Sequence, residues 1–108
     1  MKQYTTPEQT AKLIELGFND PKTKLPFEVA NDELGYTYSI GELIGILPPI
    51  YSDRWKGDCY INISHDSISW LVDYTVSGAR KPHIIVSNIE LIDALYDMIL
   101  KLKKEKVL

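Results

Sequence analysis

Strict alternation of apolar and polar residues in the middle of the chain constrains its fold more than any other feature. Apolar side chains occupy every second position over Cys59–Ile63 and again over Ile68–Val76. This period of two is typical of strands that bury one face. We therefore predict two paired strands with a turn centred on His65 and Asp66.

A turn at that place also fixes which residues face each other. Ile61 then pairs with Trp70 and Cys59 with Val72, so that the apolar partners share one face. A shift by one position would place Ile61 opposite Ser69, and the lost apolar pairing is expected to disfavour it. The same register makes Asp58 a partner of Asp73, which we interpret as two acidic residues tolerated at an exposed edge.

The remaining elements are expected around this hairpin. A turn over Ser77–Lys81 and the β-branched segment His83–Val86 predict a third antiparallel strand. Three helices are expected, two of them after capping boxes that begin at Thr6 and Ser39. Their predicted extents are Pro7 to about Leu16, a second helix that ends near Ile46 before Pro48, and a third that follows a cap at Ser87–Glu90 and reaches about Glu105. Residues 19–30 show no sustained period and predict a loop, with a short extended piece around residues 25–29.

The chain has the size of one domain, and we treat residues 1–108 as a single unit. The expected fold class is α+β: a three-stranded antiparallel β-meander packed against about three α-helices, with a long C-terminal helix. The apolar arc of that last helix is wider than one sheet contact needs, so the first two helices or a second copy of the chain must cover the rest. We expect a homo-oligomer that uses this surface.

Charge and composition exclude several functions. Twelve basic against fifteen acidic residues give a net charge of −3, so the overall field does not favour strong nucleic-acid binding. No apolar stretch is long enough for a signal peptide or a membrane span. The single cysteine forbids an internal disulfide and offers no pair for zinc or redox chemistry, which is typical of a cytoplasmic protein.

Several combinations of residues that suggest catalysis fail on geometry. His65, Asp66 and Ser67 are the residue types of a hydrolase triad, but consecutive side chains of a tight turn diverge. The glycines of Gly41–Gly45 lie within a predicted helix and not between a strand and a helix, where a phosphate loop belongs. His65 and His83 fall at opposite ends of the predicted meander. We therefore expect no catalytic residue, no metal, no cofactor and no enzymatic activity.

One group of residues predicts a binding site. In the predicted register residues 54–56 lie opposite residues 75–77, which places that segment and the turn over residues 77–83 at one end of the hairpin. Both arginines of the chain are then brought together with neighbouring lysines, an indole and an imidazole: Arg54, Trp55, Lys56, Arg80, Lys81 and His83. Arginine binds phosphate or carboxylate through two parallel hydrogen bonds, and an aromatic ring stacks on a base. The alternative is that these cations pair with Asp53 and Asp58. The lysines of residues 101–106 are interpreted as a solvated helix end.

The aromatic residues leave two interpretations open. Trp70 and Tyr74 lie on the apolar face and are expected in the core. Tyr36 and Tyr38 alternate before the second helix and indicate either a short strand or an aromatic surface. Further aromatic residues at Tyr51, Trp55 and Tyr60 favour the surface, which would serve as a binding interface.

Three segments carry a resemblance to other proteins: Thr5–Phe18, Tyr38–Ile44 with Leu47 and Pro48, and Glu90–Ile99. They resemble short uncharacterised proteins encoded by phages, prophages and mobile elements of gut anaerobic bacteria. These segments are helices and caps and carry no catalytic residues to transfer. The resemblance implies a small accessory protein, and among such proteins inhibitors of host enzymes and sequesterers of nucleotide signals in antiphage defence are common.

The sequence therefore predicts a non-catalytic binding protein of phage or mobile-element origin. As a counter-defence factor it would inhibit a host protein or sequester a phosphorylated or nucleotide ligand. Two alternatives stay open at this point: a small structural or adapter subunit, and a small hydrolase acting on nucleotides. The expected partners are a host protein or a small phosphorylated ligand, with no membrane.

Overall fold

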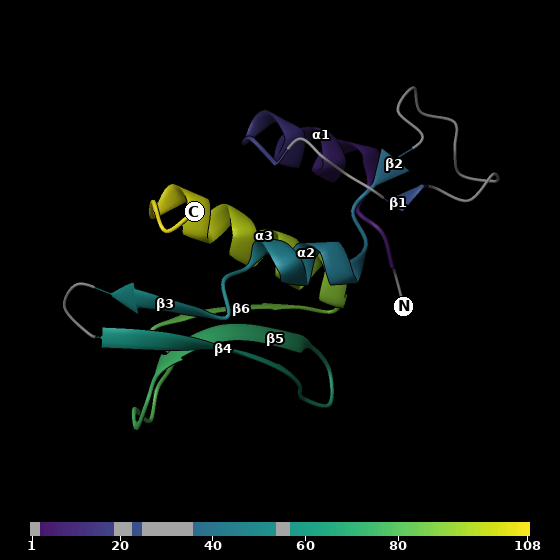
Figure 1. Cartoon of the computed structure of the whole chain (residues 1–108). Coiled ribbons are helices and arrows are strands. Elements are labelled where there is room, and N and C mark those ends of the chain that lie inside the picture. Colours follow the sequence, from purple (N-terminus) through teal and green to yellow (C-terminus); the bar gives the residue numbers. More distant parts are fainter. Residues whose placement is uncertain (1–2, 19–22, 25–35, 54–56) are drawn as a thin grey trace.

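The computed structural model has the predicted α+β class, with helices stacked on one face of an antiparallel sheet (Figure 1). It describes residues 3–18, 23–24, 36–53 and 57–108. None of the described helices is long and apolar enough to cross a membrane.

The sheet has four strands, one more than predicted. In the order of both the chain and the sheet they are β3 (Ile50–Asp53), β4 (Gly57–His65), β5 (Trp70–Val76) and β6 (Ile84–Asn88). The prediction missed β3, which pairs with the first residues of β4. This strand is too short to show an alternating pattern of its own, and it follows directly on Pro48 and Pro49.

The β4–β5 pairing differs from the predicted register by four positions. Ile61 pairs with Tyr74 instead of Trp70, and Trp70 pairs with His65. The physical reason lies in the turn, where the Asp66 carboxylate accepts hydrogen bonds from the backbone N–H groups of Ile68 (2.7 Å) and Ser69 (2.6 Å). Residues 66–69 therefore form a four-residue connection. Because the shift is even, the apolar residues stay on the predicted face.

The same shift separates the two aspartates that were predicted to pair. Asp73 lies opposite Asn62 instead, and Asp58 lies opposite Ser52 of β3. The Ser52 hydroxyl donates a 2.7 Å hydrogen bond to the Asp58 carboxylate.

Local capping interactions set the first two helices where the sequence predicted them. In α1 (Pro7–Glu15) the Thr6 hydroxyl accepts from the Gln9 N–H, and the Gln9 side chain accepts from the Thr6 N–H. Ser39 and Glu42 form the same reciprocal pair at α2 (Ile40–Ile46). Gly17, at φ +103°, ends the first helix in the left-handed conformation.

The third helix starts later than its predicted cap. Ser87 and Asn88 belong to β6, where they pair with Leu71 and Trp70 of β5. Helix α3 therefore begins after Glu90 and spans Leu91–Lys104. Ser87 and Asn88 therefore pair in the sheet instead of starting the helix.

The layers are the sheet, then α3 with α2 beside it, then α1 (Figure 1). The apolar side chains of α3 are buried within a single chain: Leu91, Ile92, Ala94, Leu95, Met98, Ile99 and Leu102. The sheet contributes Cys59, Val72 and Tyr74 to the same core. This chain covers most of the apolar arc of α3, although Tyr96 and Leu100 stay half-buried. The homo-oligomer therefore stays a prediction.

Two short strands, β1 (Thr23–Lys24) and β2 (Tyr36–Thr37), pair separately from the main sheet. Tyr36 thus lies in a short strand, and Tyr38 is buried. The short strand expected for this segment is present at Tyr36, and Tyr38 belongs to the core. The extended piece predicted around residues 25–29 lies outside the described residues.

Candidate functional site

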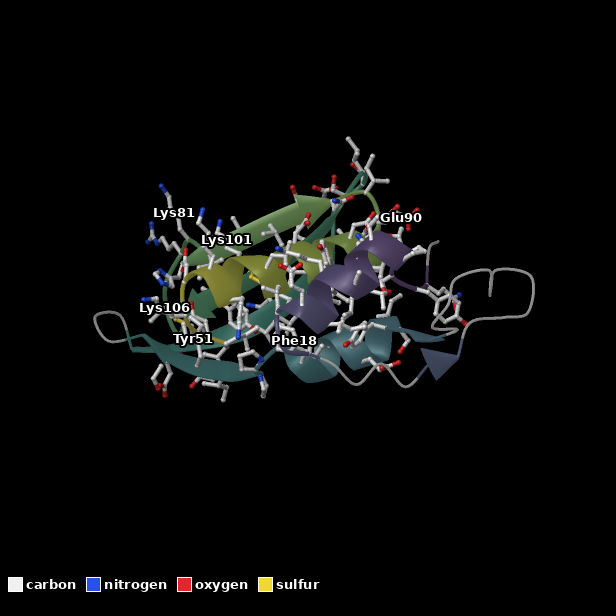
Figure 2. The ribbon with its side chains drawn as sticks, turned by 90° about the horizontal axis from the view of Figure 1, so that it is seen from above. Phe18, Tyr51, Lys81, Glu90, Lys101 and Lys106 are labelled. Atoms are coloured by element: carbon white, nitrogen blue, oxygen red, sulfur yellow. The ribbon has the colours of Figure 1, made fainter. Side chains whose placement is uncertain are left out.

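The fold gathers positive charge at one end of the molecule. Strand β6 leads away from the β5–β6 turn to the other end of the sheet. Helix α3 then runs back along the sheet, so its C-terminus lies at the same end as that turn (Figure 1). Figure 2 shows Lys81, Lys101 and Lys106 on this side, away from Glu90. We call the following residues the basic end: Arg80, Lys81, Lys101, Lys103, Lys104 and Lys106.

Two backbone turns position the residues of the basic end. In the β5–β6 connection the Ala79 N–H donates to the Val76 carbonyl (2.9 Å), and Gly78 adopts φ +83°. At the end of α3, Lys106 has φ +63°, and the following Val107 N–H donates to the Leu102 carbonyl (2.9 Å). Both turns leave their cationic side chains in solvent.

The cations of the basic end are not neutralised locally. Within the described part of the chain, no carboxylate lies within salt-bridge distance of any of the six. Most of them are exposed, and Lys103 is half-buried with its Nζ 5.5 Å from the centroid of the Phe18 ring. This arrangement suits the binding of an anion through several hydrated charges.

Several acidic residues lie toward the other end, although Asp58 at the start of β4 and Glu105 after α3 lie at the basic end. Glu90 and Asp93 flank the start of α3, and Asp66 lies in the β4–β5 turn. Asp93 accepts a 2.8 Å hydrogen bond from the Gln9 side chain, which links α3 to α1. The charges are therefore separated along α3.

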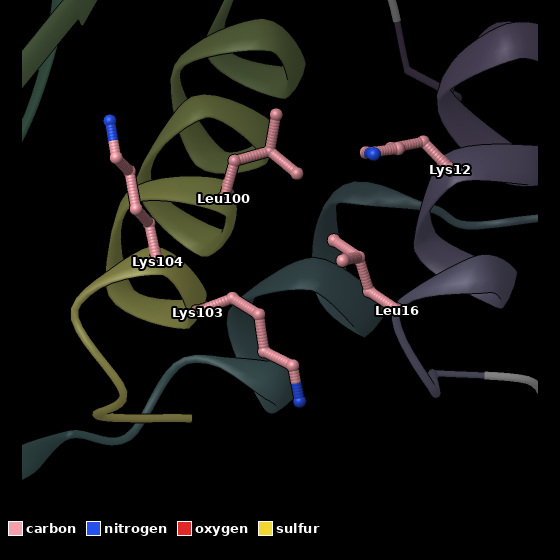
Figure 3. Close-up of a pocket in the computed structure, with 5 residues that line it drawn as sticks. All are labelled: Lys12, Leu16, Leu100, Lys103 and Lys104. Atoms are coloured by element: carbon pink, nitrogen blue, oxygen red, sulfur yellow. The ribbon is translucent and has the colours of Figure 1, made fainter.

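A hollow of about 420 Å³ opens between α1 and α3, beside the basic end. It is lined by Lys12, Leu16, Leu100, Lys103 and Lys104. Figure 3 shows the two leucines pointing toward each other across the gap, and Lys12 extending from α1 toward α3. Two of its lysines, Lys103 and Lys104, also belong to the basic end.

Of the predicted site residues, the structure places three. Arg80 and Lys81 are exposed in the β5–β6 connection, and His83 is half-buried with its backbone N–H donating to the Tyr74 carbonyl (2.8 Å). Arg54, Trp55 and Lys56 lie outside the described residues, and so their part in the site stays a prediction. The flanking residues Asp53 and Gly57 pair with each other.

The register argument for joining residues 54–56 to residues 75–77 was wrong by four positions. Both connections still belong to one end of the sheet, because β4 begins at Gly57 and β5 ends at Val76, which pairs with Cys59. The β5–β6 connection therefore lies at the end of the sheet where β4 begins, and the predicted meeting of Arg54 with Arg80 stays a prediction.

Sequence reasoning missed the contribution of α1 and α3 to this region. Lys12, Leu16 and Leu100 carry no motif, and the run of lysines over residues 101–106 was interpreted as a solvated helix end. The available signal was that this run must lie near the β5–β6 turn if the last helix returns along the sheet.

Hydrogen bonding and burial shift the pKa of groups in the sheet, in its β4–β5 turn and in α3. Hydrogen bonds from the Ser69 and Ile68 backbones lower the pKa of Asp66. Burial raises the pKa of Tyr74. Burial also raises the pKa of Asp97, which a hydrogen bond from Asn88 opposes.

Among the described residues, no group of three or more His, Cys, Asp and Glu side chains is placed to hold a metal ion. Comparisons with protein-family models, curated protein sequences and solved structures give no match. The resemblance to phage and mobile-element proteins stays a prediction.

Proposed function

We propose that this protein is a non-catalytic binding protein that takes up a phosphorylated ligand at its basic end. The observation that supports this proposal is the gathering of six cationic side chains from the β5–β6 turn and the end of α3, with no described carboxylate in salt-bridge range. The chain as a whole has a net charge of −3, so this end is a local exception.

Several contacts must act together in such a site. An exposed ion pair contributes about 0–1 kcal/mol, because both partners are hydrated and side-chain freedom is lost. Arg80 provides a planar group that holds a phosphate through two hydrogen bonds, whereas the lysines act as mobile point charges. A ligand that carries more than one phosphate charge therefore gains most from this end.

Inorganic tripolyphosphate is a suitable probe for this proposal. Isothermal titration calorimetry on the full chain would compare the parent protein with the double variant Arg80→Gln, Lys81→Gln. We expect the affinity to fall by about fivefold or more, since two exposed contacts of about 0.5–1 kcal/mol each are removed.

A charge-matched control separates a local effect from a change in net charge. Lys24 lies in β1, at the opposite end from the C-terminus of α3 (Figure 1). Lys24→Gln should leave the affinity for tripolyphosphate within about twofold, whereas Lys81→Gln alone should lower it more. Equal effects of the two single variants would overturn the assignment to the basic end.

The proposal includes the counter-defence role that the resemblance implies. Retention of a phosphorylated nucleotide would remove it from solution without changing it chemically. Incubation of a nucleoside triphosphate with the purified protein should return the nucleotide intact after denaturation. Recovery of a hydrolysed nucleotide would support the hydrolase alternative and contradict this proposal.

The adapter alternative is favoured by a different surface. No described element covers the sheet face opposite α3, and three of its side chains are notably exposed: Ile50 at 49%, Tyr60 at 40% and Ile85 at 45%. If the chain is an adapter subunit, Ile85→Gln should reduce the native mass of the assembly or release a bound protein. A native mass of one chain for both the parent and this variant would argue against self-assembly through this face.

A further inference from the structure

We propose that the hollow between α1 and α3 binds the apolar part of an amphipathic anion, a ligand in which a phosphate or carboxylate is joined to an alkyl or acyl chain. This inference deepens the proposed function and rests on it, because the hollow shares Lys103 and Lys104 with the basic end. It adds that the ligand is selected by its apolar portion as well as by its charge.

The hollow combines an apolar floor with a cationic rim. Leu16 directly follows α1 as its C-cap and faces Leu100 of α3, and both leucines are half-buried. The side chains of these leucines are left incompletely covered by the described protein, and contact with an alkyl chain would remove that surface from water.

The charged residues that line the hollow are all lysines. Lys12 is 46% exposed, and its Nζ lies 3.9 Å from Glu15, a separation at the limit of an ion pair. Lys103 and Lys104 border the hollow from α3. An anionic head group can therefore contact ammonium groups from both helices while its chain lies on the leucines.

The size of the hollow favours a small molecule over a folded partner. Its volume of about 420 Å³ falls within the range of about 300–1,000 Å³ that is typical of small-molecule sites. Inorganic phosphate alone would leave the leucines uncovered. The complementary ligand is therefore both charged and apolar.

The affinity of the full chain for octyl phosphate tests this inference. It would be measured by calorimetry at concentrations below those at which octyl phosphate aggregates. Two reference probes each carry one half of its chemistry: inorganic phosphate and octan-1-ol. We expect octyl phosphate to bind about tenfold more tightly than either reference. A tenfold difference corresponds to about 1.4 kcal/mol, which is the transfer of about two methylene groups from water.

A substitution on the floor separates the apolar contact from the charge. Leu100→Gln keeps good helix propensity and removes part of the apolar surface. We expect this variant to weaken octyl phosphate binding about fivefold or more and to leave tripolyphosphate binding unchanged. Ile89→Gln is the matched control, because Ile89 is an exposed aliphatic residue before the start of α3, away from the hollow; it should change neither affinity.

The rim is tested by Lys12→Gln, because Lys12 lines the hollow but does not belong to the basic end. This variant should weaken octyl phosphate and leave octan-1-ol unchanged. Circular dichroism and a thermal melt on each variant would establish that the fold is retained, and Leu100→Met provides a conservative second substitution that should keep binding.

The outcomes distinguish this inference from the proposed function. If octyl phosphate binds no more tightly than inorganic phosphate while Lys81→Gln still weakens tripolyphosphate binding, the hollow is not a site and the proposed function stands. If Leu100→Gln and Ile89→Gln weaken octyl phosphate binding equally, the alkyl chain binds elsewhere and the inference is wrong. If neither tripolyphosphate nor octyl phosphate binds the parent protein, both proposals fail.

Discussion

The hydroxyl of Tyr74 donates a 2.7 Å hydrogen bond to the carbonyl oxygen of Pro48. Tyr74 lies in β5 and is fully buried, whereas Pro48 follows α2. The Tyr74 ring also meets the ring of Tyr51 edge to face, with centroids 4.9 Å apart. One side chain therefore joins an inner strand, the edge strand β3 and the segment that leads into it.

Removal of this hydroxyl should destabilise the protein. Tyr74→Phe keeps the ring in the core but leaves the Pro48 carbonyl without its donor, so we expect the free energy of unfolding to fall by about 1–1.5 kcal/mol. Urea denaturation followed by circular dichroism would measure it. Tyr60→Phe, on the exposed sheet face, should change it by less than about 0.5 kcal/mol. Equal losses would show that the hydrogen bond contributes nothing specific.

The same hydroxyl should make stability depend on pH in the alkaline range. Burial raises the pKa of Tyr74 above its ordinary value of 10.0, so above about pH 10 the unfolded chain binds fewer protons than the folded one. The contribution of the Tyr74 hydroxyl to the free energy of unfolding is therefore complete below about pH 10, and it falls as the pH rises above that value. We expect a smaller fall between about pH 9 and about pH 11 in Tyr74→Phe than in the parent chain. Identical slopes in urea titrations of the two proteins would contradict this assignment.

The turn at Asp66 should depend on an acceptor oxygen and not on charge alone. Asp66→Asn keeps an oxygen that can accept from the Ile68 and Ser69 N–H groups, whereas Asp66→Ala removes it. We expect faster hydrogen exchange of these two amides and a lower melting temperature in the alanine variant, with the asparagine variant close to the parent. Equal exchange in all three proteins would mean that strand pairing alone sets the turn.

Lys106 occupies a backbone conformation that favours glycine. Its φ of +63° places it in the left-handed region just after α3, where a side chain is unfavourable. Lys106→Gly should raise the free energy of unfolding by about 0.5–1 kcal/mol. Lys104→Gly removes the same charge from within the helix and should lower it by about 0.5–1 kcal/mol. Thermal melts of both variants would test the contrast, and a loss of stability in the first would refute it.

Features that depend on neighbours in the sequence were predicted well. The reciprocal bonds of Thr6 with Gln9 and of Ser39 with Glu42 involve residues three positions apart, so their pattern is visible without tertiary information. The apolar alternation of β4 and β5 is local in the same sense. Burial of Val72 and Tyr74 followed from it directly.

Features that depend on competition between interactions were predicted less well. The apolar pattern alone accepts any even shift, so it could not distinguish Trp70 from Tyr74 as the partner of Ile61. The hydrogen bonds of Asp66 favour the observed register, because they require a turn that is two residues longer than the predicted one. Ser87 belongs to a capping pattern in the sequence, but it pairs with Leu71 in the sheet and does not cap α3.

The candidate site shows the limit most clearly. Arg80 and Lys81 were identified because rare arginines stand out in a sequence. Lys104 and Leu100 join that region only through the return of α3 along the sheet, and Lys12 only through the placement of α1 above it. Such proximity between residues far apart in the chain is tertiary information that periodicity does not contain.

The separation of acidic and basic residues along α3 gives the molecule a permanent dipole moment. A net charge of −3 repels an approaching anion on average, yet the field along this axis turns the lysine-rich pole toward it before contact. Rotational steering would then speed the encounter, and added salt should slow association far more than it hastens release.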